Sequence, residues 1–179
     1  MFMGRKYLWN HTKYISTGTL PYEGIKGAFC ANLHMKAYLD SNVFITYLLG
    51  QKGEDDADIL LKKCAGCSFS IVSSTTVFAE IQVRCDGHAT ILLQKLSDDL
   101  EKLGKLEIYA PDDETREKAD DLNLQTGKEF GMNDFIHALL SKKKADLFVT
   151  NDFAFMSIAS KYSNVKSVRS FLSDLEAQA

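Results

Sequence analysis

Four acidic residues could act together as metal ligands: Asp40, Glu80, Asp134 and Asp152. Carboxylates that face one another repel, and either protonation or the binding of a cation relieves that repulsion. Hard divalent cations with oxygen ligands, Mg²⁺ or Mn²⁺, suit such a set. A cation held in this way pairs with phosphate, activates water and stabilises an in-line displacement. Any one of the 24 acidic residues is more often a solvated surface group, so the interpretation depends on whether the fold brings these four together.

Strands and helices alternate from residue 36 onward, as apolar spacing and the flanking cap and turn residues indicate. We expect strands over Lys36–Asp40, Phe69–Val72, Leu106–Ala110, Leu147–Thr150 and Val165–Val168. We expect helices over Val43–Leu49, Asp58–Cys64, Thr75–Arg84, Leu92–Leu103, Asp113–Leu124, Asp134–Lys142, Phe153–Ser160 and Phe171–Glu176. Ser41 or Asn42, Ser73 and Ser74, and Asn133 are candidate caps. The alternation predicts an α/β sandwich with a mostly parallel central sheet flanked by helices on both faces.

The four acids occupy positions that such a sheet brings to one edge. Asp40 ends the first strand, and Asp152 lies two residues beyond Thr150, which ends the fourth. Glu80 lies in the first turns of the helix after the second strand, and Asp134 opens the helix that leads into the fourth. Binding groups collect beyond the carboxyl ends of parallel strands, so all four acids can converge there. This joint placement favours a metal site over four unrelated surface charges.

Three segments resemble one known family. They are AYLDSNVFITYLL from residue 37, IVSSTTVFAEI from residue 71 and GMNDFIHALLSKKKADLFVTNDFAF from residue 131. Together they resemble the PIN-domain family of metal-dependent nucleases, and most of all its VapC-type toxins, over about residues 35–172. The resemblance implies a PIN-like three-layer sandwich in which Asp40, Glu80, Asp134 and Asp152 form the acidic site. It also matches Asn42 and Thr150 to polar supporting positions.

The resemblance implies an Mg²⁺- or Mn²⁺-dependent endoribonuclease, the toxin of a VapBC-type toxin–antitoxin pair. RNA would be the substrate, an antitoxin would cover the acidic groove, and the chain would form a homodimer. Two alternatives stay open: an RNA-processing PIN nuclease outside a toxin–antitoxin system, and a PIN interaction module without catalysis. The presence of all four acids favours the enzyme.

A second set of residues has the spacing of zinc ligands. Cys64, Cys67, Cys85 and His88 form C-x2-C-x17-C-x2-H. The simpler alternative is small buried cysteines at the ends of elements. The family resemblance requires no zinc at this place, so the zinc site is the lesser of the two interpretations.

Other residues could contact the substrate. His137 lies one turn after Asp134 on the same helix face, where it could touch substrate or a metal-bound water; a satisfied buried histidine is the alternative that we favour. Candidates for contacts with the RNA backbone are Arg84, Lys142–Lys144, Lys161 and Arg169. The lysine run has an ordinary explanation, because cations suit the C-terminus of a helix.

The composition is that of a globular protein: 179 residues, 45% hydrophobic and 25% charged, with net charge −3. Residues 1–34 differ from the rest, because four cations against Glu23 give them a charge of +3. We expect this aromatic and basic segment to be an irregular extension, with the PIN domain at 35–179; Met35 could also be the biological start. The sequence contains no run of about 18 apolar residues, so it predicts no membrane span. No apolar signal segment follows the first cations either, so we expect a cytoplasmic protein.

Overall fold

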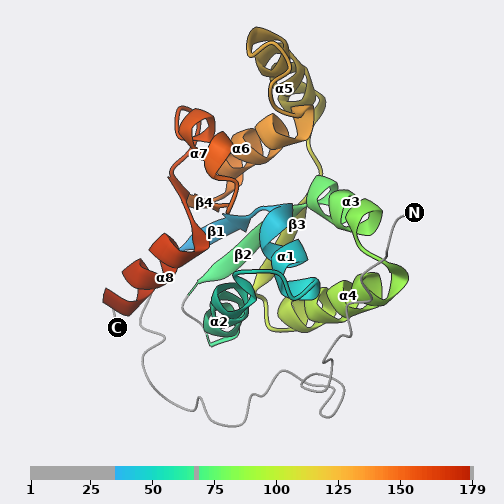
Figure 1. Ribbon diagram of the computed structural model, residues 1–179, viewed down its shortest axis with the longest axis vertical. Coiled ribbons are helices and arrows are strands. Elements are labelled where there is room, and N and C mark those ends of the chain that lie inside the picture. The colour runs from blue at the N-terminus through green and yellow to red at the C-terminus, as the bar shows by residue number, and fades with distance from the viewer. Residues whose placement is uncertain (1–34, 67–68, 178–179) are drawn as a thin grey trace, which may run out of the picture.

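The computed structural model describes residues 35–66 and 69–177. Within them, five strands alternate with eight helices (Figure 1). The strands are β1 (Lys36–Leu39), β2 (Ser70–Ser74), β3 (Leu106–Tyr109), β4 (Leu147–Val149) and β5 (Val165–Lys166). The helices are α1 (Ser41–Leu48), α2 (Glu54–Ala65), α3 (Thr75–Arg84), α4 (Gly87–Lys102), α5 (Asp113–Gln125), α6 (Met132–Lys144), α7 (Phe153–Ala159) and α8 (Val168–Ala177). The expected extension, residues 1–34, lies outside the described residues.

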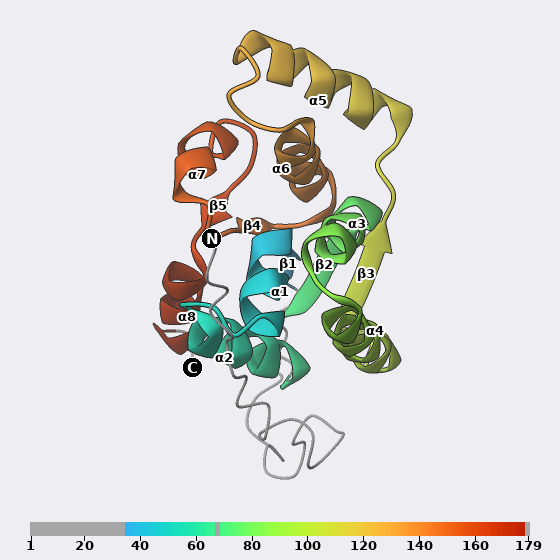
Figure 2. The same ribbon diagram turned by 45° about the vertical axis from the view of Figure 1, so that its right-hand side comes forward.

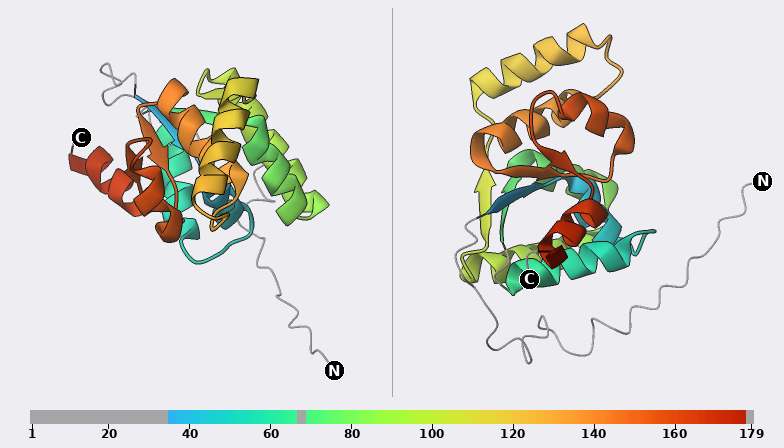
Figure 3. Two further views of the ribbon diagram at one scale, coloured as in Figure 1. Left: turned by 90° about the horizontal axis from the view of Figure 1, so that it is seen from above. Right: turned by 90° about the vertical axis from the view of Figure 1, so that its left-hand side faces the viewer.

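The strands form one sheet in the order β3-β2-β1-β4-β5, and each described pair is parallel. Helix α6 packs on β1, β2 and β4 and forms one outer layer with α7, while α5 lies on the far side of α6 (Figures 2 and 3). Helices α1 to α4 form the layer on the opposite face, and α8 lies beside α2 (Figure 2). The three-layer α/β sandwich predicted from the sequence is therefore confirmed.

The central strand explains why this order is stable. Ala37, Tyr38 and Leu39 are each fully buried, since helices cover both faces of β1 and strands flank both of its edges. A strand buried on both faces reads as a continuous apolar run, as this one does. In the parallel register Leu39 lies beside Val149, so the next residues, Asp40 and Thr150, emerge side by side from the carboxyl edge.

The helix starts correct several sequence expectations. Ser74 caps α3 as expected, accepting a hydrogen bond from the Val77 N–H (3.3 Å). Helix α1 begins after Asp40, so neither Ser41 nor Asn42 is its cap.

Helix α6 likewise begins after Gly131 and not at Asn133. The Asp134 carboxylate accepts the Gly131 N–H (2.8 Å), so a side chain within the first turn satisfies an N–H that would otherwise lack a partner. The polar side chains that were expected to cap α1 and α6 are used in the site between these helices.

Among residues 35–66 and 69–177, none of the helices combines the length and the apolar character needed to span a bilayer.

Candidate metal centre

Asp40 is held rigidly at the carboxyl end of β1. Its side chain is only 8% exposed, and its backbone N–H bonds the Val149 carbonyl (3.0 Å). One carboxylate oxygen, Oδ2, accepts from Thr150 Oγ1 (2.6 Å) and from Asn42 Nδ2 (2.8 Å). The other oxygen, Oδ1, accepts a longer bond from Ser41 Oγ (3.3 Å). Asp40 Oδ1 therefore has the greater remaining capacity to bind a ligand.

Thr150 and Asn42 link the ends of β1 and β4. The Thr150 hydroxyl, fully buried, donates to Asp40 and accepts from Asn42 Nδ2 (2.9 Å) and from the Asp152 N–H (3.0 Å). Asn42 Oδ1 in turn accepts the Asn151 N–H (3.1 Å). These two side chains hold the Asp40 carboxylate and the backbone before Asp152 in place. Their supporting role at a metal site stays a prediction.

Glu80 reaches the same place from α3. Its Oε1 accepts from Asn133 Nδ2 (2.8 Å), and its Oε2 lies 3.2 Å from His137 Nε2. Partial burial of Glu80 would raise the pKa of the carboxyl, but the hydrogen bond and charge of His137 outweigh it, with help from Ser41 and Asn133, and lower that pKa to about 2. Glu80 is therefore an anion throughout the physiological range.

His137 is 1% exposed and bonded on both ring nitrogens. Nε2 faces Glu80, and Nδ1 lies 2.9 Å from the Tyr38 hydroxyl, which donates to Ser74 Oγ (2.8 Å). Burial would lower the pKa of His137, but Glu80, Asp40 and Asp134 together raise it. The histidine is thus buried and satisfied, as we favoured from the sequence, but one of its partners is a site carboxylate, which the sequence did not reveal.

Three side chains offer ligand atoms close enough for one ion. Atoms of Asp40, Glu80 and His137 all lie within 4.8 Å of one another, and no other such group of His, Cys, Asp and Glu occurs in the described part of the chain. Two carboxylates and an imidazole are a chemically suitable donor set for a divalent cation. The site can therefore accommodate the cation that the fold family implies.

The other two predicted acids lie beside this group. Burial, followed by the charges of Asp40 and Glu80, raises the pKa of Asp134, although the Gly131 N–H bond opposes this. Asp134 thus shares the electrostatic environment of the three ligands. The Asp152 N–H donates to the Thr150 hydroxyl (3.0 Å), and Asp152 Oδ1 caps α7 by accepting the Phe155 N–H (2.9 Å). Both acids remain predictions as ligands, direct or through water.

The zinc alternative stays a prediction. Cys64 is buried at the end of α2, Cys85 is partly buried at the end of α3, and Cys67 lies outside the described residues. Cys64, Cys85 and His88 do not form a close group of three ligands.

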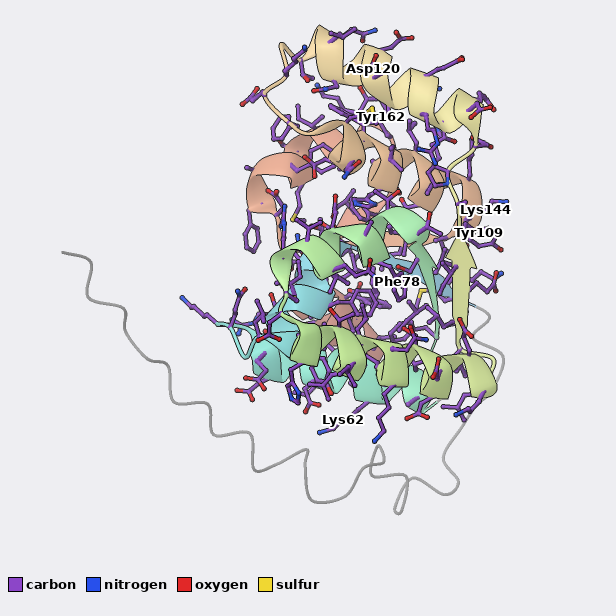
Figure 4. The ribbon with its side chains drawn as sticks, turned by 90° about the vertical axis from the view of Figure 1, so that its right-hand side faces the viewer. Lys62, Phe78, Tyr109, Asp120, Lys144 and Tyr162 are labelled. Atoms are coloured by element: carbon purple, nitrogen blue, oxygen red, sulfur yellow. The ribbon has the colours of Figure 1, made fainter. Side chains whose placement is uncertain are left out.

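The lysine run lies far from the acids. Helix α6 begins at the acidic edge, so at 1.5 Å per residue Lys144 is about 15 Å further along its axis than Asp134. Lys143 pairs with Asp112 (3.4 Å) and Glu114 (3.2 Å), and Lys144 lies over the Tyr109 ring (4.7 Å; Figure 4). These lysines have partners within the chain and are poorly placed to contact a phosphate at the site.

The remaining candidates for contact with the RNA backbone are Arg169, Lys161 and Arg84. Arg169 pairs with Asp56 (3.2 Å), and Lys161 follows the C-terminal end of α7. Arg84, exposed and one turn beyond Glu80 on α3, is the better-placed candidate for RNA contact.

Comparison with known proteins identifies the family. The chain is similar in fold to a chain in the crystal structure of VapBC2 from Rickettsia felis bound to a DNA fragment from their promoter, with TM-score 0.50, 22% identity and coverage of 74% of this chain and 98% of that one. PAE2754 from Pyrobaculum aerophilum gives TM-score 0.49 and 11% identity over 81% and 99% of the two chains. VapBC-1 from nontypeable Haemophilus influenzae gives 0.48 and 15% over 75% and 99%. No curated protein matches the chain. The family model for the PIN domain matches residues 37–161, and the chain therefore belongs to the PIN domain family.

Proposed function

We propose that this protein is a divalent-cation-dependent endoribonuclease and the toxin of a VapBC-type toxin–antitoxin pair. PIN-domain proteins are nucleases, and the chain belongs to that family. The observation that supports activity here is the group of Asp40, Glu80 and His137 ligand atoms within 4.8 Å of one another, at the carboxyl edge of the sheet. A PIN module without catalysis would have no need of such a costly concentration of buried charge.

The roles of the residues follow from their contacts. Asp40 and Glu80 would hold Mg²⁺ or Mn²⁺, with Asp134 and Asp152 beside them to bind directly or through water. When bound, the cation offsets charge on a scissile phosphate and increases the acidity of a water. Thr150 and Asn42 hold the Asp40 carboxylate in one rotamer, and Asn133 does the same for Glu80. Arg84 is available to contact the RNA backbone.

The proposed protein partners are an antitoxin and a second copy of the chain. The VapC-like motifs and the fold shared with the VapBC2 chain support an antitoxin that covers the acidic edge. An arginine side chain would suit that surface, because a bidentate Arg–carboxylate pair is strong when shielded from water. The same resemblance supports a homodimer.

Residues 1–34, with their charge of +3, are the competing candidate for covering the acids. Deletion of residues 1–34 distinguishes the two: greater activity of the shortened chain, with no partner co-purifying with the full chain, would contradict the antitoxin.

The test of activity is cleavage of an RNA pool by the purified full chain with Mn²⁺, with Mg²⁺ or with chelator. We expect cleavage with the cations, none with chelator and none by Asp40→Asn. Asp98→Asn is the matched control, because Asp98 is an exposed α4 acid whose carboxylate accepts from Gln94 (2.8 Å), and it should cleave like the wild type. Cleavage that persists in folded Asp40→Asn, or in chelator, would contradict the proposed mechanism.

A further inference from the structure

The imidazole of His137 is held in one orientation by a buried chain of hydroxyl groups. Tyr38 Oη donates to Ser74 Oγ (2.8 Å), and Ser74 Oγ also accepts the Val77 N–H (3.3 Å). Tyr38 and Ser74 are each fully buried. Because Tyr38 Oη also contacts His137 Nδ1 (2.9 Å), this row of hydroxyl groups links β1, β2 with the start of α3, and α6. The same elements position Asp40, Glu80 and Asp134.

The directions of these bonds assign the two ring nitrogens. A phenol has one proton, and Tyr38 uses it on Ser74, so its oxygen can only accept from His137 Nδ1 (2.9 Å). Nδ1 therefore has its hydrogen toward Tyr38. Nε2 lies 3.2 Å from Glu80 Oε2 and donates its hydrogen to this carboxylate, which can only accept. A cation at the site would take the place of that hydrogen and bind the Nε2 lone pair.

This is the arrangement found at histidine metal ligands, in which the nitrogen that does not bind the metal donates a hydrogen bond that fixes the tautomer and the ring orientation. The ligand atoms of His137, Asp40 and Glu80 are also within reach of one ion. We propose that His137 binds the cation through Nε2, which makes this a mixed nitrogen–oxygen centre that selects a first-row transition ion over Mg²⁺.

The selectivity follows from ligand chemistry. Mg²⁺ takes oxygen ligands in a near-ideal octahedron and usually keeps several waters. Imidazole nitrogen, in contrast, contributes strongly to the binding of first-row transition ions. Replacing one oxygen ligand by a buried imidazole should therefore weaken Mg²⁺ relative to Mn²⁺, Fe²⁺ or Co²⁺. This inference rests on the proposed metal centre and adds a ligand and an ion preference to it.

The first experiment uses the unmodified full chain with Mn²⁺ as the probe. Electron spin-echo envelope modulation of bound Mn²⁺ should show ¹⁴N coupling, and ¹⁵N-histidine labelling should replace it with ¹⁵N coupling. The chain has four histidines, so a variant with His11, His34 and His88 changed to Gln leaves His137 as the sole imidazole and should keep the signal. Bound Mn²⁺ without histidine coupling would overturn the inference and leave the nuclease proposal standing, whereas no bound Mn²⁺ would overturn both.

The second experiment measures selectivity by calorimetric titration of Mn²⁺ and Mg²⁺. His137→Gln keeps an amide that can bond Glu80 but lacks the imidazole, and should raise the Kd for Mn²⁺ at least about tenfold while changing the Kd for Mg²⁺ much less. His88→Gln is the matched control and should change neither. Equal weakening of both ions by a folded His137→Gln protein would overturn the inference. If that variant does not fold, the labelling result on the wild-type chain still decides the matter.

Discussion

Removal of the Thr150 hydroxyl should lower both the stability of the fold and its affinity for Mn²⁺, although the side chain hardly changes in shape. Thr150→Val keeps the shape and the β-branch of the side chain but removes one donor and one acceptor at a fully buried position. The lost bonds are those to Asp40 Oδ2 (2.6 Å), from Asn42 Nδ2 (2.9 Å) and from the Asp152 N–H (3.0 Å).

The magnitude follows from these three contacts. A hydrogen bond to a charged group contributes about 1.5–3 kcal/mol and one between neutral groups about 1 kcal/mol. The effects do not add fully, because Asn42 Nδ2 keeps its bond to Asp40 and Asp152 is only partly buried. We therefore expect Thr150→Val to lower the free energy of unfolding by about 2–4 kcal/mol. Loss of a group that orients a ligand should also raise the Kd for Mn²⁺ by about 10–100-fold.

Urea denaturation in chelator measures the first effect and calorimetric titration with Mn²⁺ the second. Thr115→Val is the matched control, because Thr115 is also buried (1% exposed) and its hydroxyl accepts from Lys143 (2.9 Å) at a place remote from the acids. It loses one bond to a charged group. Because Lys143 is partly exposed and keeps its pairs with Asp112 and Glu114, the loss should cost about 1.5 kcal/mol, the low end of that range, and leave Mn²⁺ affinity unchanged. If Thr150→Val loses no more stability than Thr115→Val, or binds Mn²⁺ as tightly as the wild type, the assigned role of Thr150 is wrong.

Three further predictions concern the acids. Asp40→Asn should abolish Mn²⁺-dependent RNA cleavage with an unchanged circular dichroism spectrum, because it removes a charge that the cation needs; gel assays of cleavage test this. Mn²⁺ should raise the melting temperature of the wild type by mass action, and chelator should reverse the rise. Mn²⁺ should raise the melting temperature of Asp134→Asn by less than that of the wild type. In chelator this variant should be no less stable than the wild type, because burial and the neighbouring acids already disfavour the ionised Asp134. Glu80, with a pKa lowered from 4.5 to about 2, stabilises the fold above pH 4.5 and loses this contribution as the pH falls toward 2. In metal-free buffer the difference in unfolding free energy between wild type and Glu80→Gln should therefore shrink across that range, and a difference independent of pH would contradict the lowered pKa.

The positions of Asp40 and Thr150 could be predicted because they depend on chain order and a simple rule. Both follow buried strands, and the carboxyl ends of parallel strands share an edge. The register confirms this for the two, since Leu39 pairs with Val149. The helix caps were less predictable, because Ser41, Asn42 and Asn133 have cap chemistry, yet all three bond site carboxylates instead of capping a helix. Local propensity cannot show a competing partner that lies far away in the chain.

The contacts of His137 could not be predicted from the sequence. Its phase on α6 placed it on the face of Asp134, and period-two alternation places Tyr38 on the same face of β1 as Asp40. Those two facts together indicate that a tyrosine and a histidine lie beneath the acids, but neither shows that they meet. Contact requires the position at which α6 crosses β1, which depends on side-chain packing between layers. Only the resulting bonds, Tyr38 to Nδ1 and Glu80 to Nε2, turn a buried histidine into a candidate ligand. The part of the site that sets ion preference is thus the part encoded in tertiary packing, whereas the part that attracts a cation can be read from strand ends.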